Sequence, residues 1–344
     1  MWEYFRRKYR IKKTGDALSA LNQKTAFWKP FLLMLPSLIT ITLMTIIPFI
    51  LVIIWSFKVE NGPRASQFVI GFNNYAKIFN DDKYIVGIRN SFIYALLSLP
   101  MSLAISILIS TAITMVVKKW ARSFWQTVFF LPYVTSAIAV SLTFAYIFQP
   151  EHGDGLINSI LGKHGSNAIK FLNGGPTSWS AFIVILTRGI WGSLAFQILI
   201  LTTAMLSVNQ NLYKSASIDG ASQRKQFFTI TLPSIQRTIS FLFTMGIIGG
   251  IKVFPLAIFG NNAKAAVING GSSLMLYVYY LTSDSKFNTA AAASIMLFIF
   301  GVALSFVMRK LAALTYKGVI KIGERNVLNK IENKTLKRTI SFKI

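Results

Sequence analysis

Long apolar runs separated by shorter polar stretches are the main pattern of this 344-residue chain. Six runs are each long enough to cross about 30 Å of hydrocarbon at about 1.5 Å per helical residue. They cover residues 31–57, 91–117, 124–148, 179–206, 238–259 and 289–308. The first run is too long for a signal-peptide core and no small-residue cleavage site follows it, so we expect it to remain as a span. The pattern predicts an all-α, multi-pass membrane protein with six transmembrane helices.

The composition agrees with this fold class. Hydrophobic residues make up 53% of the chain and charged residues only 14%, a balance typical of membrane proteins. We expect a basic N-terminal segment (1–30), a first helix (31–57), an external loop (58–90), a five-helix core (91–308) that contains a polar loop (207–237), and a basic tail (309–344). The tail is expected to lie on anionic lipid headgroups, with a specific partner as the alternative.

The net charge of +25 is distributed unevenly about the spans. If the N-terminus is inside, 25 of the 36 Lys and Arg residues fall on inside segments, nine on outside loops and two within spans. The positive-inside rule therefore places both termini and the loop 207–237 in the cytoplasm. This distribution also argues against nucleic-acid binding, which would need a basic patch on a folded domain.

The polar loop contains the segment LYKSASIDGASQRKQFFTITLPSI, from Leu212 to Ile235. Asp219 and Gly220 form a turn dipeptide, in which Gly can take positive φ and Asp can cap the following helix. We expect two short helices that meet at Gly220 and lie on the membrane surface. The first places on one face Tyr213, Ala216 and Gly220. The second has an apolar side and ends at Pro233; that side consists of Phe227, Phe228, Ile230 and Leu232.

Two cations lie inside predicted spans, where a charge costs roughly 2.5 to 3.5 kcal/mol on insertion scales. Arg188 lies in the fourth span and Lys252 in the fifth, and no acidic residue of the predicted spans can pair with them. Two interpretations stay open: the cations bond to backbone carbonyls or reach the membrane surface, or they face a wet path and meet anionic cargo. Pro255 is expected to kink the fifth span and free a carbonyl.

The same fifth span carries a G-x-x-x-G spacing at Gly246 and Gly250, with Gly249 beside them. Small residues at this spacing let two helices approach closely. The contact could lie within this chain or form a seam with a partner subunit.

The chain lacks the residues that several kinds of chemistry require. The chain has no cysteine and two histidines, so thiol chemistry is excluded and no metal site is expected. No G-x-x-x-x-G-K-[ST] phosphate loop occurs, so the chain cannot hydrolyse ATP itself, and no catalytic residue set is found. The predicted spans hold no carboxylate for a proton relay, which weighs against an ion-coupled secondary carrier without excluding one.

The polar loop resembles the cytoplasmic loop of ABC importer permeases, whose pattern is E-A-A, two residues, D-G-A, five residues, F, then I-T-L-P. The matching residues are Asp219, Gly220, Ala221, Phe227, Ile230, Thr231, Leu232 and Pro233. Lys214 and Ser215 replace the family's Glu and Ala, while Ala216 is kept. The resemblance implies a type I importer permease in which this loop, with Tyr213, is the coupling helix that docks on a separate ATPase. Small residues at the bend would suit that docking.

Further segments resemble the branch that imports sugars, glycerol phosphate and polyols. They are GFNNYAKIF (71–79), LPYVTSAIAV (131–140), GLINSIL (155–161), Trp191 and NGGSS (269–273). The resemblance implies a second permease subunit, two ATPase subunits that bind ATP and Mg, and an extracellular solute-binding protein, with no cofactor on this chain. The reversed charge at Lys214 favours a paralogue as the second permease subunit over a second copy.

The same resemblance bears on whether the cargo is charged or neutral. The segment GGIKVFPLAIF resembles a family segment that has Gln where this chain has Lys252 and Asp where this chain has Pro255. The charge of this chain is therefore locally more positive than that of the family segment. A substrate path that includes Arg188, Trp191, Lys252 and Phe254 would then suit a phosphorylated polyol better than a neutral sugar.

Overall fold

The computed structural model describes residues 28–60, 68–149 and 155–310, so most of the basic N-terminal segment and nearly all of the basic tail lie outside the described residues. The chain divides into two units, residues 1–52 and 53–344, which are considered separately. The first unit holds α2 (Trp28–Ile41), the π-helical turn η2 (Thr42–Ile46) and the start of α3 (Ile47–Phe57). These segments form the first predicted span. None of its most apolar residues is buried, so its surface needs lipid or protein around it.

The described residues of the segment predicted as an external loop, 58–60 and 68–90, form short strands and helices. Strands β1 (Lys58–Glu60) and β2 (Phe68–Ile70) pair antiparallel, and α4 (Asn73–Phe79) follows them. The Asn74 amide is buried and donates to the carbonyls of Ser56 at 3.0 Å and Lys58 at 2.8 Å. Asn74 therefore satisfies backbone groups at the C-terminal end of α3, which gives this residue a structural role.

Helix α5 (Asp82–Met115) starts nine residues before the second predicted span, within the predicted loop. The Asp81 carboxylate caps it by accepting from the Lys83 N–H at 3.0 Å, and the Tyr277 hydroxyl donates to the same carboxylate at 2.8 Å. Burial raises the pKa of the Tyr277 phenol, and the hydrogen bond to Asp81 raises this pKa further. Tyr277 thus stays a neutral donor that fixes the start of α5.

The third predicted span is broken in the structure. Helices α6 (Lys119–Val134) and α7 (Ala137–Phe148) bend by 90° at the two residues between them, where one span over residues 124–148 was expected. Pro132 lies in the last turn of α6, and the Thr135 hydroxyl donates to its carbonyl at 2.7 Å. The Ser136 hydroxyl then caps α7 by accepting from the Ala139 N–H at 3.5 Å. Local hydrogen bonds of these hydroxyls replace the helical ladder at the break.

The remaining long helices are α9 (Ser180–Leu206), α13 (Gln236–Ile251) and the helix Phe287–Lys310. Helix α13 ends at Ile251, so Pro255 does not kink it as predicted but follows an irregular segment that leads into η5 (Leu256–Phe259). Shorter elements on the connections are α8 (Gly155–Ile160), η3 (Gly165–Asn167), α14 (Ala263–Ile268) and α15 (Leu274–Ser283). Within the described ranges, five helices are long and apolar enough to span a membrane, and the bent pair α6 and α7 raises this number to six if it counts as one span.

Helices α5, α9 and α13 share a buried core with the helix Phe287–Lys310. On α13, a Cβ at Gly246 would collide with the Leu99 side chain, and one at Gly250 would lie 3.2 Å from the Ala95 backbone. A Cβ at Gly249 would meet nothing within 4 Å. The close approach predicted from the glycine spacing is thus a contact with α5 inside this chain at Gly246 and Gly250, and Gly249 takes no part in it.

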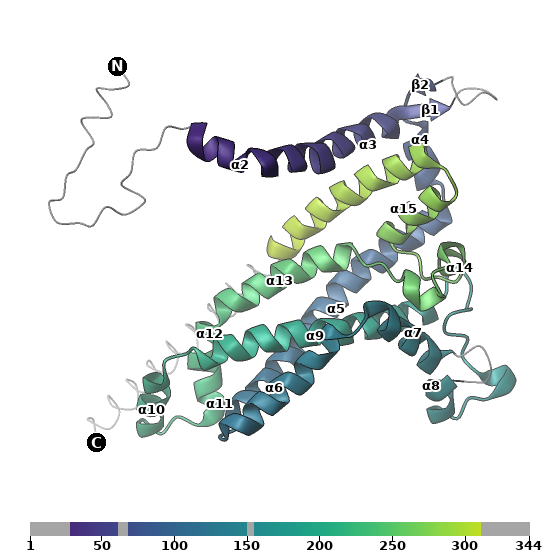
Figure 1. The fold of residues 1–344 in the computed structure, drawn as a ribbon. Helices are drawn as coiled ribbons and strands as arrows, with labels where there is room; N and C mark the ends of the chain where they lie inside the picture. Colours follow the sequence, from purple (N-terminus) through teal and green to yellow (C-terminus); the bar gives the residue numbers. More distant parts are fainter. Residues whose placement is uncertain (1–27, 61–67, 150–154, 311–344) are drawn as a thin grey trace, which may run out of the picture. The chain divides into compact units, whose positions relative to one another are not determined.

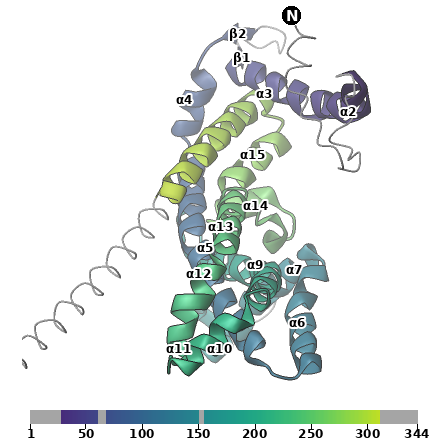
Figure 2. The same ribbon diagram turned by 90° about the vertical axis from the view of Figure 1, so that its left-hand side faces the viewer.

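Figures 1 and 2 show how the second unit is arranged. In both views α10 and α11, the short helices of the polar loop, lie at one end beside the start of α6, and α4 and α15 lie at the opposite end. Helix α5 runs between the two ends, and α9 and α13 pack against it. The loop packs against α5, α9 and α13, the same helices that line the cavities described below.

Candidate functional site

The polar loop folds into α10 (Gln210–Ile218), α11 (Gln223–Gln226), the π-helical turn η4 (Phe227–Thr231) and α12 (Leu232–Ser234). Gly220 lies between the first two helices with φ of +71°, the left-handed conformation predicted for it. Its N–H donates to the Ser217 carbonyl at 3.1 Å, and the Ala221 N–H donates to the Ala216 carbonyl at 2.9 Å. These two bonds form a Schellman motif, which ends α10 and fixes the angle of the bend.

The predicted capping by Asp219 is wrong. Asp219 is the C-cap of α10, and its N–H donates to the Ser215 carbonyl at 3.1 Å. Ser222 caps α11 instead, by accepting from the Lys225 N–H at 3.4 Å. The Schellman motif takes up both Gly220 and Ala221, so the cap of the next helix is Ser222, three residues after Asp219. Asp219 remains exposed at the tip of the loop.

One face of the loop packs against the helix bundle. The Tyr213 hydroxyl lies 2.8 Å from the Thr231 hydroxyl, and Phe227 and Ile230 pack against the core shared by α5, α9 and α13. Gln226 braces the bend, since its amide donates to the Ser217 hydroxyl at 3.0 Å and the Ala221 carbonyl at 2.9 Å. The bend is therefore held by side chains as well as by the backbone.

The other face of the loop is exposed. Its exposed charged side chains are Lys214, Asp219, Arg224 and Lys225, and its most exposed large apolar side chains are Ile218, at 87%, and Phe228, at 65%. Phe228 is thus exposed while Phe227 and Ile230, predicted on the same apolar side, pack against the bundle, because the π-helical turn shifts the direction of Phe228 relative to an α-helix. The exposed residues among those predicted for docking are Lys214, Ser215, Asp219, Gly220 and Pro233, while Tyr213, Ala216, Ala221 and Phe227 are half-buried.

A cavity of about 520 Å³ lies behind the loop. Tyr213, Gln226 and Phe227 line it from the loop, and Arg122 lines it from α6. The Arg122 guanidinium donates twice to the Val116 carbonyl, at 2.8 Å and 3.2 Å, which ties the start of α6 to the end of α5. The loop, α5 and α6 consequently meet around one hollow.

A second cavity of about 460 Å³ lies among α5, α6, α9 and α13. Its polar lining consists of Tyr94, Ser98, Ser102, Tyr133, Ser193 and Gln197. The Gln197 amide donates to the Ser102 hydroxyl at 3.1 Å and its oxygen accepts from the Ser106 hydroxyl at 3.0 Å. Hydroxyls and an amide of this kind bind hydroxylated solutes through neutral hydrogen bonds.

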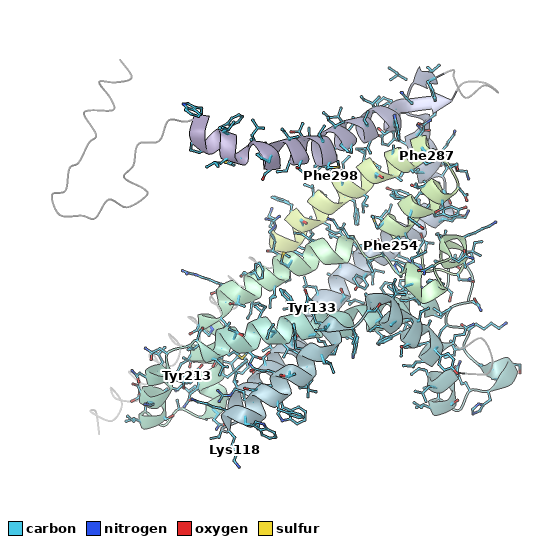
Figure 3. All side chains as sticks on the ribbon, in the orientation of Figure 1. Lys118, Tyr133, Tyr213, Phe254, Phe287 and Phe298 are labelled. Atoms are coloured by element: carbon cyan, nitrogen blue, oxygen red, sulfur yellow. The ribbon has the colours of Figure 1, made fainter. Side chains whose placement is uncertain are left out.

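The residues predicted for a substrate path divide between two places. Arg188, Lys252 and Phe254 line one cavity of about 200 Å³, whereas Trp191 packs against Phe144 with ring centres 5.7 Å apart and does not line it. Figure 3 shows Phe254 and Tyr133, which line the smaller and the larger cavity respectively, on separate elements of the bundle. Three of the four residues predicted for the path therefore line one cavity, and the fourth lies outside it.

The larger cavity was missed altogether. Its serines follow one face of α5 at four-residue spacing, from Ser98 to Ser110. This stripe was visible in the sequence, but small hydroxyl residues at such spacing are equally typical of plain helix packing. Ser106 and Ser110 do pack in this way, because both are fully buried against α9, and only the outer part of the stripe opens into the cavity. In the described ranges, no group of three or more His, Asp or Glu residues could hold a metal ion.

Comparison with known proteins identifies the family. Residues 102–317 match the family described as "Binding-protein-dependent transport system inner membrane component". The chain is 45% identical over 304 residues to the "Probable ABC transporter permease protein MG188 homolog" of Mycoplasma pneumoniae, covering 88% of this chain and 91% of that protein. It is 26% identical over 279 residues to the "Arabinooligosaccharides transport system permease protein AraP" of Halalkalibacterium halodurans, covering 80% and 85%.

A further relative is the "sn-glycerol-3-phosphate transport system permease protein UgpA" of Yersinia pestis, 23% identical over 290 residues, covering 82% of this chain and 95% of that protein. The fold resembles that of a chain in the crystal structure of a bacterial ABC transporter involved in the import of the acidic polysaccharide alginate. That likeness has a TM-score of 0.65 at 23% identity, and it covers 83% of this chain and 95% of the other. The chain therefore belongs to the family of binding-protein-dependent transport system inner membrane components, and it is a multi-pass permease subunit of an ABC importer in the plasma membrane.

Proposed function

We propose that the loop from α10 to α12 docks on a separate ATPase and carries its movement into the membrane. The observation that carries this proposal is the exposed bend at Gly220, braced from behind by Tyr213 and Gln226. A rigid projection can transmit a push, whereas a flexible loop would absorb it. The ATPase subunits supply ATP and Mg, and this chain supplies the surface on which they dock.

The proposed complex contains this chain, a second permease subunit, two ATPase subunits and an extracellular solute-binding protein. Lys214 is exposed on the docking face and stands where a Glu is expected. A second copy of this chain would give both ATPase contacts the same reversed charge, and a paralogue would give only one of them that charge. This difference supports a paralogue as the second permease subunit.

The proposed orientation puts the loop and both termini in the cytoplasm. The distribution of Lys and Arg supports it, since basic residues concentrate on the side of the loop. The end of the second unit that carries α4 and α15 then faces outward (Figure 2), where a solute-binding protein would deliver its cargo.

The proposed cargo is a sugar, a glycerol phosphate or a related polyol. Two of the relatives are named for arabinooligosaccharides and sn-glycerol-3-phosphate, both of which carry hydroxyl groups. The hydroxyls and the amide that line the 460 Å³ cavity support a hydroxylated solute. Transport follows alternating access, a two-state rearrangement biased by ATP on one side and by the loaded solute-binding protein on the other.

Reconstitution tests the proposal. The chain is co-expressed with its partners, placed in lipid vesicles with the solute-binding protein, and tested with sugars, polyols and phosphorylated polyols. Cargo that stimulates ATP hydrolysis and enters only with ATP is the expected result. Uptake that survives ATP depletion while ion gradients are maintained would instead indicate an ion-coupled secondary carrier.

A further inference from the structure

The cavity that Arg188 and Lys252 share contains no counter-charge. Among the described residues, a carboxylate lies within 4.0 Å of a cation only in the pair Lys286 and Asp284, on the connection after α15. The other lining residues of the cavity are hydroxyl, small or apolar, and they include Tyr94, Ser141 and Phe254. Two cations that face one hollow without an acid repel each other, and an anion between them would remove that repulsion.

Arg188 is only partly satisfied by the protein. One of its Nη atoms donates to the Ala137 carbonyl at 3.3 Å, at the first residue of α7 after the break. Its Nε atom is buried and has no hydrogen-bond partner. A buried N–H without an acceptor is unfavourable, and a guanidinium presents its donors in a fork that matches a carboxylate or a phosphate.

The backbone around Lys252 is held in place. Lys252 follows the last residue of α13, and the Ser273 hydroxyl donates to the carbonyl of the next residue, Val253, at 2.7 Å. The dipole of α13 favours a cation at this end of the helix, which accounts for Lys252 taken alone. The dipole does not account for Arg188, which comes from the middle of another helix to line the same cavity.

The smaller cavity adjoins the larger one. Tyr94, Gly189 and Gly249 line both the 200 Å³ cavity and the 460 Å³ cavity. Pockets that hold a whole drug-sized ligand measure roughly 300 to 1,000 Å³. The smaller cavity is below this range and suits a single anionic group, while the larger one suits a hydroxylated body.

We propose that Arg188 and Lys252 form an anion subsite, so that the cargo of this permease is a hydroxylated solute carrying a phosphate or a carboxylate. The anion lies between the two cations, and the hydroxylated body contacts the serines and Gln197 in the adjoining cavity. This inference rests on the proposed role of the chain as an importer subunit. It goes further because it predicts the charge of the cargo and the residues that select it.

The first test measures uptake by the complete reconstituted complex. The probes are sn-glycerol 3-phosphate and glucuronate as the two kinds of anion, with glycerol and arabinose as neutral counterparts. Lys252→Gln should raise the KM for the anionic probe that is transported by about ten- to a hundred-fold, the effect of losing one charge-assisted hydrogen bond, and leave uptake of neutral probes unchanged. Lys252→Arg should restore most of the affinity, and the matched control Lys264→Gln, at an exposed position on α14, should change nothing.

The outcomes separate the two proposals. Uptake of any probe that does not need ATP refutes the proposed function. ATP-dependent uptake of neutral probes only, or an equal effect of Lys252→Gln on charged and neutral probes, overturns the anion subsite alone. A change in KM for sn-glycerol 3-phosphate identifies the anion as a phosphate, and a change for glucuronate identifies it as a carboxylate.

The second test needs no transport and uses the absence of cysteine from the chain. In the assembled complex, the Lys252→Cys variant gives this chain a single thiol, and its labelling by a negatively charged sulfonate reagent and by a positively charged ammonium reagent is measured on this chain. The sulfonate should react several-fold faster relative to a free thiol, and adding Arg188→Gln should abolish this preference. Equal relative rates, or a preference that does not depend on Arg188, would show that Arg188 does not act on this cavity.

Discussion

The Tyr213 hydroxyl lies 2.8 Å from the Thr231 hydroxyl and so joins the two arms of the loop across eighteen residues of sequence. Tyr213 comes from α10, before the bend at Gly220, and Thr231 ends the π-helical turn after it. Figure 3 shows Tyr213 at the same end of the second unit as Lys118, which precedes α6. This bond joins the two arms of the loop, as the proposed coupling role would require.

Removal of that bond should weaken coupling without unfolding the loop. Tyr213→Phe keeps the ring in its half-buried place and deletes only the hydroxyl, which costs about 0.5 to 1.5 kcal/mol. We expect a small fall in thermal stability together with a clear loss of cargo-stimulated ATP hydrolysis. Tyr146→Phe, at a ring that is 72% exposed on α7, is the matched control. Unchanged stimulation in Tyr213→Phe would mean that the two arms need not be joined.

Gly220 offers a test of the bend itself. A β-branched residue resists its φ of +71°, and such backbone strain costs of order 1 to 3 kcal/mol. A Cβ at this position would meet nothing within 4 Å, so the strain comes from the backbone alone. Gly220→Val should abolish ATP-dependent uptake while membrane insertion stays normal.

Gly220→Asn provides the control for that experiment, because Asn tolerates the left-handed region better than other non-glycine residues. It should retain most of the uptake that Gly220→Val loses. If both variants transport normally, the bend plays no part in coupling.

The sequence alone predicted those elements of the fold that depend on one physical property of their residues. Runs of apolar residues located the long helices, and the dipeptide at Gly220 located the bend, because few residues other than glycine accept positive φ. The positions of the prolines did not predict where a helix breaks. Pro100 lies inside the continuous helix α5, whereas Pro132 precedes the 90° break between α6 and α7. The difference depends on the local hydroxyl bonds of Thr135 and Ser136 and on packing, which no single-residue rule captures.

The residues that line a cavity were likewise only partly predictable from the sequence. Arg188 and Lys252 were recognisable as charges that are unfavourable in a membrane, since each lies in an apolar run that contains no acidic residue. Their presence in one cavity depends on where α13 ends, and the expected kink at Pro255 gave no indication of that end. Trp191 carried a family resemblance, yet its ring packs on Phe144. A resemblance transfers a residue's position in the chain, but the direction of its side chain depends on the helix packing.

The basic tail provides a prediction that lies outside the described residues. Deleting residues 317–344 removes eight basic residues, each worth about 1 kcal/mol at an anionic surface, from a protein that its spans already anchor. Transport should stay within a few-fold of that of the full chain, measured at equal expression. Complete loss of transport with normal expression would indicate a specific partner for the tail.

The glycines of α13 give the last prediction, because they distinguish packing within this chain from a seam with a partner. A side chain at Gly246 collides with Leu99 on α5, so Gly246→Val should lower the stability of the isolated chain by about 1 to 3 kcal/mol, the usual cost of overpacking. Gly249 is the matched control, since a Cβ there meets nothing within 4 Å; Gly249→Val should change thermal unfolding in detergent by less than about 0.5 kcal/mol. Adding Leu99→Ala should make room for the new side chain and recover part of the loss in Gly246→Val. If Gly246→Val instead left the isolated chain as stable as before and only reduced co-purification of the second permease subunit, the glycines would form the seam between subunits.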